Sequence, residues 1–281
     1  MKKLLLCTGG WSGDRYLSAF LAMKPRFEGY AAACGAEMGV IDHPLDPEGR
    51  RTLFTQKLLI PRTYGRYDVV AHMDLDVLIP RNLPSIFDAL PAEAGFGAVV
   101  DPRGSFAFQK AWGFADWTRM SHKAYFESLG LSSERELASI NAGVVVFRPG
   151  LVADMFAAWY FDDARYAHKS EGDYSSEEVP LAYLSQDAGL FAPLEYRFNR
   201  QVFFALHETS AGKAAYRDYR SFVNRARRKA RKALGFRSAH VGFGPSYTLF
   251  VEDLLKDGNL VHFAGKYPVP EVNQDLLVRS Q

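Results

Sequence analysis

The feature that most constrains the fold is a pair of carboxylates, Asp74 and Asp76, one residue apart at the end of an apolar run. Val69–Ala71 has the composition of a buried strand. Side chains of a strand alternate between its two faces, so both acids would leave the carboxyl end of the strand on the same side. Two carboxylates placed in this way can hold a hard divalent cation, which keeps other positions for water or phosphate oxygens. Asp-x-Asp is also common in solvated turns, and the pair alone does not decide between these readings.

Apolar runs that alternate with helical patterns predict an α/β sheet with helices on its faces. Strands are expected at Leu4–Cys7, Tyr30–Ala33, Met38–Ile41 and Ala98–Val100, and helices at Thr52–Thr63 and Leu151–Phe161. In such sheets ligands bind beyond the carboxyl ends of the strands, which places Thr8, Asp74 and Asp101 at one rim. With 281 residues, 48% of them hydrophobic, the chain can bury a large core.

Positive charge is concentrated in one segment of the chain. Lys213–Lys232 contains nine lysines and arginines and one acid, a charge of +8, whereas the rest of the chain carries −6. Apolar residues recur within it at helical spacing, so it is expected to form an amphipathic basic helix for an anionic membrane surface, an acidic glycan or nucleic acid. An ordinary solvated face is the alternative. We therefore expect a catalytic core at 1–205, a basic helical segment at 206–247, and a return to the core at 248–281.

Cysteine content and hydropathy bear on the location of the protein. Cys7 and Cys34 provide one disulfide at most, which suits a reducing compartment. No run approaches the ~20 apolar residues that span a bilayer. The expected location is the cytoplasm, with possible peripheral contact to the inner face of the membrane through the basic segment.

Four short motifs follow one another along the chain: Asp74-Leu75-Asp76, Asn141-Ala142-Gly143, Ser185-Gln186-Asp187, and His262-Phe263-Ala264-Gly265-Lys266. Together and in this order they resemble those of the retaining GT-A glycosyltransferases of family 8, the glycogenin and bacterial galactosyltransferase type. The resemblance runs from about Lys57 to Lys266. It implies a GT-A fold, in which a central, mostly parallel Rossmann-like sheet is flanked by helices. It also implies transfer of a hexose from a UDP-sugar, such as UDP-glucose or UDP-galactose, to a glycan or other hydroxyl acceptor with retention.

The resemblance implies a metal site made by Asp74, Asp76 and His262. Two carboxylates and one imidazole satisfy the oxygen and nitrogen preference of Mn²⁺ or Mg²⁺ and leave positions for two diphosphate oxygens. Taken alone, His262 is better explained as a hydrogen-bonded residue at a strand end, and its position after Leu260-Val261 and before an Ala-Gly turn is what favours a metal ligand.

Further donor contacts are implied by the same resemblance. They comprise Thr8 and Tyr16 in the first loop, Lys57 near the nucleotide, Asp101 on sugar hydroxyls, Asn141, Ala142 and Gly143 as the floor under the sugar, and Gly265 and Lys266 at the phosphates. Small residues permit close approach of a ring, and an amide both donates and accepts. A β-bulge glycine at Gly143, a solvated helix face at Lys57 and a turn cap at Asp101 are the structural alternatives.

Gln186 and Asp187 are the candidates for the reacting carbon. Gln186 matches the family glutamine in this place, and Asp187 is either a nucleophile or a residue that positions the acceptor. Helix capping by Asp187 is the alternative. Two other functions fit the same residues. One is a nucleotidyltransferase, although the first loop has no lysine for a triphosphate, and the other is an inactive GT-A-like protein that binds anionic membrane or nucleic acid through its basic helix.

Overall fold

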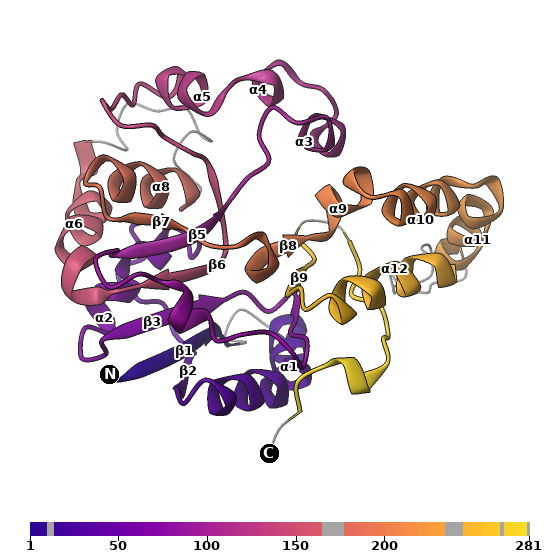
Figure 1. Cartoon of the computed structure of the whole chain (residues 1–281), viewed down its shortest axis with the longest axis horizontal. Helices are drawn as coiled ribbons and strands as arrows, with labels where there is room; N and C mark the ends of the chain where they lie inside the picture. Colours follow the sequence, from indigo (N-terminus) through magenta and orange to yellow (C-terminus); the bar gives the residue numbers. More distant parts are fainter. Residues whose placement is uncertain (10–13, 165–176, 234–243, 265–266, 280–281) are drawn as a thin grey trace.

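The computed structural model describes residues 1–9, 14–164, 177–233, 244–264 and 267–279. Within these ranges, a six-stranded sheet forms the centre of the molecule (Figure 1). Its strands, in spatial order, are β2 (Glu37–Ile41), β1 (Lys3–Thr8), β3 (Val69–Met73), β6 (Ile140–Phe147), β5 (Phe96–Val100) and β7 (Phe191–Pro193). β6 is antiparallel to both of its neighbours, and the other neighbouring pairs are parallel. The mostly parallel α/β sheet predicted from the sequence is confirmed.

Both faces of the sheet are covered, as the apolar alternation in β1 shows. Leu4 and Leu6 belong to the hydrophobic cluster on one face, and Leu5 and Cys7 belong to the cluster on the other. The first face is covered by η1 (Thr55–Leu59), α2 (Ile60–Thr63), α6 (Pro149–Phe161) and α8 (Glu178–Asp187), and the second by α1 (Asp14–Ala33) and η2 (Ile86–Ala89). The two cysteines, Cys7 and Cys34, are buried and free.

A small second sheet brings the C-terminal part of the chain back to the centre. It consists of β4 (Val77–Leu78), β9 (Val261–His262) and β8 (Arg200–Gln201). Antiparallel pairing of β4 with β9 sets Val77 opposite His262, and the Phe263 amide donates to the Asp76 carbonyl at 2.8 Å. Parallel pairing of β8 with β9 sets Gln201 opposite His262. The histidine is thereby fixed beside the Asp-x-Asp turn.

Two helical excursions leave this centre (Figure 1). The connection between β5 and β6 carries α3 (Phe106–Trp112), α4 (Asp116–Arg119) and α5 (His122–Ser128), and the connection between β8 and β9 carries α9 (Val202–Glu208), α10 (Ser210–Arg220), α11 (Phe222–Ala233) and α12 (Gly244–Lys256). The second excursion forms an arm that extends from the body. The segment boundaries expected at 205/206 and 247/248 fall inside α9 and α12, whose apolar side chains share one cluster with those of β4 and β9.

Three local expectations are corrected by the structure. Tyr30–Ala33, expected as a strand, is the last turn of α1, a 20-residue helix that continues through Pro25. The expected helix Thr52–Thr63 is a 3₁₀ turn followed by the single turn of α2. The basic segment is two helices, because α10 ends at Arg220, Ser221 caps it, and α11 begins at Phe222. No helix in the described part of the chain is both long enough and apolar enough to cross a bilayer.

Candidate active site

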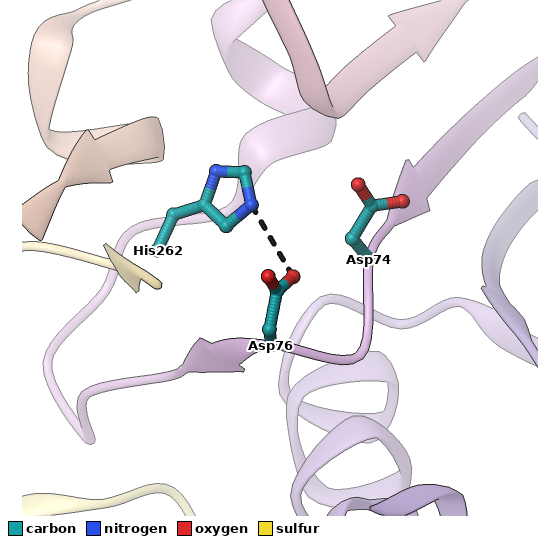
Figure 2. Close-up of side chains that lie close together, drawn as sticks. All are labelled: Asp74, Asp76 and His262. Atoms are coloured by element: carbon teal, nitrogen blue, oxygen red, sulfur yellow. Dashed lines mark ion pairs between the residues drawn. The ribbon is translucent and has the colours of Figure 1, made fainter. Parts of the chain in front are cut away.

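Asp74, Asp76 and His262 meet where the two sheets join. Asp74 follows β3, Asp76 precedes β4, and His262 ends β9. One ligand atom of each lies within 4.8 Å of one ligand atom of the others (Figure 2). His262 Nε2 is 3.2 Å from Asp76 Oδ1, and the imidazole is almost fully buried. The three residues therefore converge on one point from three separate strand ends.

A chain of side-chain amides fixes the orientation of the imidazole. Asn141 Nδ2 donates to Glu178 Oε1 at 3.0 Å, which turns Asn141 Oδ1 toward Asn199. Asn199 Nδ2 donates to that oxygen at 2.8 Å, so Asn199 Oδ1 faces His262 Nδ1 at 2.9 Å as the acceptor. Nδ1 therefore donates to Asn199 Oδ1, and the other ring nitrogen, Nε2, points toward Asp76.

The donor set fits a hard divalent cation. Nε2 lies 3.2 Å from Asp76 Oδ1, so a proton on Nε2 can bridge the two atoms, and in its place a cation can bind both. Carboxylate oxygens with one imidazole are a typical ligand set for Mn²⁺ or Mg²⁺. Asp74, Asp76 and His262 are the residues that would hold it.

Gly143 provides the space for this imidazole. A Cβ added at Gly143 would lie 2.1 Å from His262 Cε1. The Gly143 carbonyl accepts a hydrogen bond from the Asp74 amide at 2.8 Å, which ties the start of the Asp-x-Asp turn to β6. The His262 ring thus accounts for a glycine at this position. The sequence had suggested a different reason, the close approach of a sugar.

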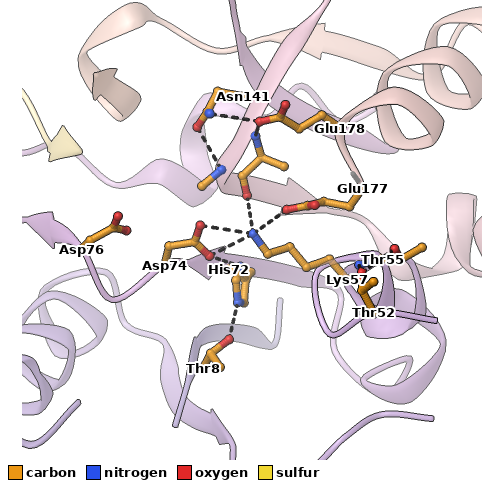
Figure 3. A network of polar contacts seen from close by, with 12 residues as sticks. Thr8, Thr52, Thr55, Lys57, His72, Asp74, Asp76, Asn141, Glu177 and Glu178 are labelled. Atoms are coloured by element: carbon orange, nitrogen blue, oxygen red, sulfur yellow. Dashed lines mark hydrogen bonds and ion pairs between the residues drawn. The ribbon is translucent and has the colours of Figure 1, made fainter. Parts of the chain in front are cut away.

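Lys57 is the charge partner of the acidic residues (Figure 3). Its buried Nζ lies 2.9 Å from Asp74 Oδ1 and 2.9 Å from Glu177 Oε1, and it donates to the Ala142 carbonyl at 3.1 Å. Burial lowers the pKa of Lys57, but the charges of Asp74 and Glu177 raise that pKa by more, so the ammonium stays protonated. Together with Asp76 these groups carry a formal charge of −2. A divalent cation would neutralise it.

Two further carboxyls, Asp101 and Glu178, influence each other at the same rim. Burial raises the pKa of Asp101 to about 6, opposed by the hydrogen bond that Gln201 Nε2 donates at 3.2 Å. Burial raises the pKa of Glu178 to about 8, and the charge of Asp101 raises it as well. Burial therefore favours a proton on the pair, and the pKa of Glu178 is raised further than that of Asp101. One member of the pair can accept a hydrogen bond from a ligand hydroxyl while the other donates one.

Comparisons with known proteins find similar structures but no matching sequence. No protein-family model and no curated protein sequence matches the chain. Solved structures do match it. Three of them are the following glycosyltransferases. A galactosyltransferase, LgtC, solved with donor and acceptor sugar analogues, is 14% identical, with 94% of this chain and 87% of that chain covered and a TM-score of 0.45. The bifunctional glycosyltransferase WbbM is 14% identical over 94% of this chain and 45% of that one, with a TM-score of 0.49. Mouse xyloside xylosyltransferase 1 is 10% identical over 95% and 99%, with a TM-score of 0.46.

Gln186 and Asp187 lie at the other end of α8 from Glu178, whose carboxyl accepts from Asn141 beside the Asp74, Asp76 and His262 site. Gln186 Nε2 donates to the Ala138 carbonyl at 2.8 Å, and its Oε1 accepts from the Ala138 amide at 2.6 Å. Asp187 is exposed at the last residue of α8. Glu178, which does reach the cluster, begins the same helix eight residues earlier, roughly 12 Å along the axis. The Gln186 amide therefore holds the segment before β6 in place.

The remaining predicted contacts are divided between the site and the surface. Thr8 Oγ1 lies 3.2 Å from Nε2 of the buried His72, directly below Asp74, whereas Tyr16 is exposed near the start of α1. The Ala142 side chain is buried in the core, and its backbone contributes the carbonyl that binds Lys57. Gly265 and Lys266 lie outside the described residues.

Sequence reasoning missed Glu177 and Glu178. Two acids in the first turn of a helix are common, because they complement the positive end of the helix dipole. Their partners Lys57 and Asn141 are far away in the sequence. An acidic pair at the start of the helix that ends in Ser185-Gln186-Asp187 was the only available signal.

Proposed function

We propose that this protein is a metal-dependent glycosyltransferase that moves a hexose from a nucleotide-diphosphate sugar, UDP-glucose or UDP-galactose, to a hydroxyl acceptor on a glycan, with retention. The observation that carries the proposal is the convergence of Asp74, Asp76 and His262 within 4.8 Å. The buried ammonium group of Lys57 and the carboxyl pair Asp101 and Glu178 lie at the same rim. When bound there, Mn²⁺ or Mg²⁺ neutralises the charge that develops on the leaving diphosphate.

The surrounding residues divide the remaining tasks. Lys57 holds Asp74 in place and limits the repulsion between the carboxylates. Asn199 presents His262 with Nε2 free to bind the cation. Asp101 and Glu178 bind donor-sugar hydroxyls, since one accepts and the other donates at neutral pH. We assign the place beside the reacting carbon to Glu178 in preference to Gln186, because the Gln186 amide is bonded to backbone groups.

An incubation with a panel of UDP-sugars and Mn²⁺, in which release of UDP is followed, tests the proposal. We expect release that depends on one or a few of the sugars, stops in excess chelator, and is abolished or nearly so in Asp76→Asn. Circular dichroism of the variant should match that of the unchanged protein, because Asp76 is a half-buried residue at a turn. Undiminished release in chelator or in Asp76→Asn refutes the metal assignment.

Two added measurements separate the competing functions. A nucleotidyltransferase would release pyrophosphate when given a nucleoside triphosphate and a sugar phosphate, and a glycosyltransferase would not. The anomeric coupling in the NMR spectrum of the product distinguishes retention from inversion. Binding to membranes or nucleic acid without turnover of any donor would favour the inactive alternative.

We also propose peripheral contact with an anionic membrane surface through Lys213–Lys232. Within this segment the cations Lys213, Arg217, Arg220 and Lys229 are exposed, and so are the apolar side chains of Phe222 and Val223. Each cation near an anionic bilayer contributes ~1 kcal/mol, and salt screens the attraction. Flotation with anionic and zwitterionic vesicles at low and high salt tests this. Binding should be confined to anionic vesicles at low salt and lost in Arg217→Glu/Arg220→Glu, and its absence from those vesicles refutes the contact.

A further inference from the structure

Four large aromatic side chains are exposed close together on α3, α4 and the turn between them. They form the aromatic patch: Phe106, Trp112, Phe114 and Trp117, with exposed fractions of 61%, 49%, 36% and 39%. Contiguous exposed apolar surface on a soluble protein marks an interaction site more often than single exposed residues do. None of the roles assigned above uses these four residues.

The rings of the aromatic patch are held from below. Trp112 packs against Trp117 with centroids 5.6 Å apart and against Phe203 of α9 at 5.4 Å. Phe108 contacts Trp117 at 6.0 Å and stacks on Phe204 at 5.4 Å. Buried aromatic rings thus support Trp112 and Trp117, so a ligand that stacks on these two would meet side chains that lose little freedom on binding.

Backbone strain is stored at one member of the patch. Phe114 has φ of 60°, the only positive value at a non-glycine residue in the described part of the chain, and it follows Gly113 at 87°. A bulky residue in the left-handed region costs free energy and persists only where its surroundings hold it. Here it keeps Phe114 against Phe106, with centroids 5.8 Å apart, at the edge of the patch.

Three chain segments run from the candidate active site into the patch and the buried rings beneath it. The segment after Asp101 leads into α3, and the segment after Gln201 leads directly into Phe203. Ala264, two residues beyond His262, packs against the buried rings Phe108, Phe203 and Phe204. The hydrogen bond from Gln201 to Asp101 joins the first two segments at their origin. The buried rings beneath the patch are therefore connected, through three short chain segments, to the residues at which the donor sugar is proposed to bind.

We propose that the aromatic patch is the subsite for the acceptor, and that the acceptor is a saccharide whose ring faces stack on Trp112 and Trp117. This inference rests on the proposed function. A sugar ring has an apolar C–H face and a polar edge, which matches aromatic faces bordered by charged side chains. Asp116 and Arg119 are exposed beside Trp117, and Lys110 lies over the Phe114 ring at 5.5 Å. Such mixed charges suit hydroxyl groups and disfavour a hydrocarbon chain.

Calorimetry and ligand-observed NMR with maltotriose, cellotriose and lactose test the subsite without any donor. We expect saturable binding of at least one probe, weakened about tenfold by Trp112→Ala and by Trp117→Ala. Phe161→Ala is the matched control, because Phe161 is an equally exposed aromatic residue on α6 and should leave binding unchanged. Thermal melting checks that each variant is folded.

Several outcomes separate this inference from the proposed function. If no UDP-sugar is turned over but probe binding depends on Trp112, the proposed function fails and the saccharide subsite stands. If transfer occurs and the variants raise neither the probe Kd nor the acceptor KM, the subsite is refuted. It is equally refuted if none of the probes binds, or if the tryptophan variants abolish a dimer or vesicle binding in place of saccharide binding. Hydrolysis of donor without acceptor should be the same in the variants and in the unchanged protein.

Discussion

Asn199 Oδ1 lies 2.9 Å from His262 Nδ1, and this contact selects the tautomer that leaves Nε2 toward Asp76. The amide cannot turn over freely, because its Nδ2 donates to Asn141 Oδ1. A residue that contacts no metal thereby determines which atom of His262 is offered to one.

The first prediction concerns this contact. Asn199→Ala should weaken Mn²⁺ binding about 10–100-fold, the usual effect of removing the partner of a ligating histidine. Calorimetric titration with Mn²⁺ alone measures it and needs no substrate. Asn224→Ala is the control, since it deletes another buried amide, one that donates to Asp218 at the junction of α10 and α11. Equal Mn²⁺ affinity in both variants would show that the tautomer is fixed by something else.

Gly143 gives the second prediction. A methyl group at Gly143 would collide with the His262 ring, so Gly143→Ala should abolish or nearly abolish Mn²⁺ binding. Gly97→Ala, in β5, makes a milder contact, 3.0 Å from side-chain carbons of Leu90 and Leu194, and should lower stability only. Titration of both variants with Mn²⁺, after a melting curve, compares them. Should Gly143→Ala bind Mn²⁺ normally and lose only UDP-sugar affinity, the sugar-floor role expected from the sequence is the correct one.

The third prediction follows from the buried charges. Lys57→Met leaves Asp74 and Glu177 without their cation and should lower the free energy of unfolding by about 3–5 kcal/mol. Lys57→Met/Glu177→Gln should recover part of this loss, because one uncompensated charge is gone. Urea unfolding in chelator measures both. No recovery in the double variant would mean that packing around the lysine stem, and not charge, accounts for the loss.

Glu178 provides a prediction about pH. Its pKa is raised in the folded protein, so folded chains hold a proton there that unfolded chains release above about pH 4. Stability should therefore fall as pH rises from about 4 to 8, and Glu178→Gln, which cannot ionise, should lack this part of the fall. We expect the melting temperature of Glu178→Gln to exceed that of the unchanged protein increasingly toward pH 8, by roughly 2–4 °C for each kcal/mol. Exposed Glu271→Gln should show no such trend.

Local patterns were sufficient to predict the rim of the sheet. The alternation of strand side chains placed Asp74 correctly after β3, and Asp101 after β5, because this geometry depends only on neighbouring residues. Tyr30–Ala33 was misread for a local reason as well. Pro25 has no backbone N–H to donate within a helix, so the sequence indicates a helix end there and the apolar residues that follow resemble a new strand. In the structure α1 continues through Pro25.

Contacts between distant segments could not be predicted in this way. The contacts of Glu177 with Lys57 and of Glu178 with Asn141 depend on the pairing of β6 with β3 and on the packing of α8 on the sheet. The short match Gln186-Asp187 was assigned to the reacting carbon, but its position at the far end of α8 turns Gln186 toward Ala138. A motif gives residue types and order, and the helix register decides which of its ends reaches the site.

The antiparallel direction of β6 has a consequence for how such an enzyme can change. Because β6 starts where β5 ends, the 102–138 connection leaves and re-enters the sheet at one point, closed by the hydrogen bond from the Asp101 amide to the Ser139 carbonyl at 2.9 Å. Its ends are as close as those of a hairpin loop, so a change in the length of its exposed part does not strain the strands, whereas Phe108, Phe126 and Leu131 hold its buried part against the hydrophobic clusters. If the proposed function is correct, exchange of the exposed part between relatives would change the acceptor preference and leave the donor site unchanged.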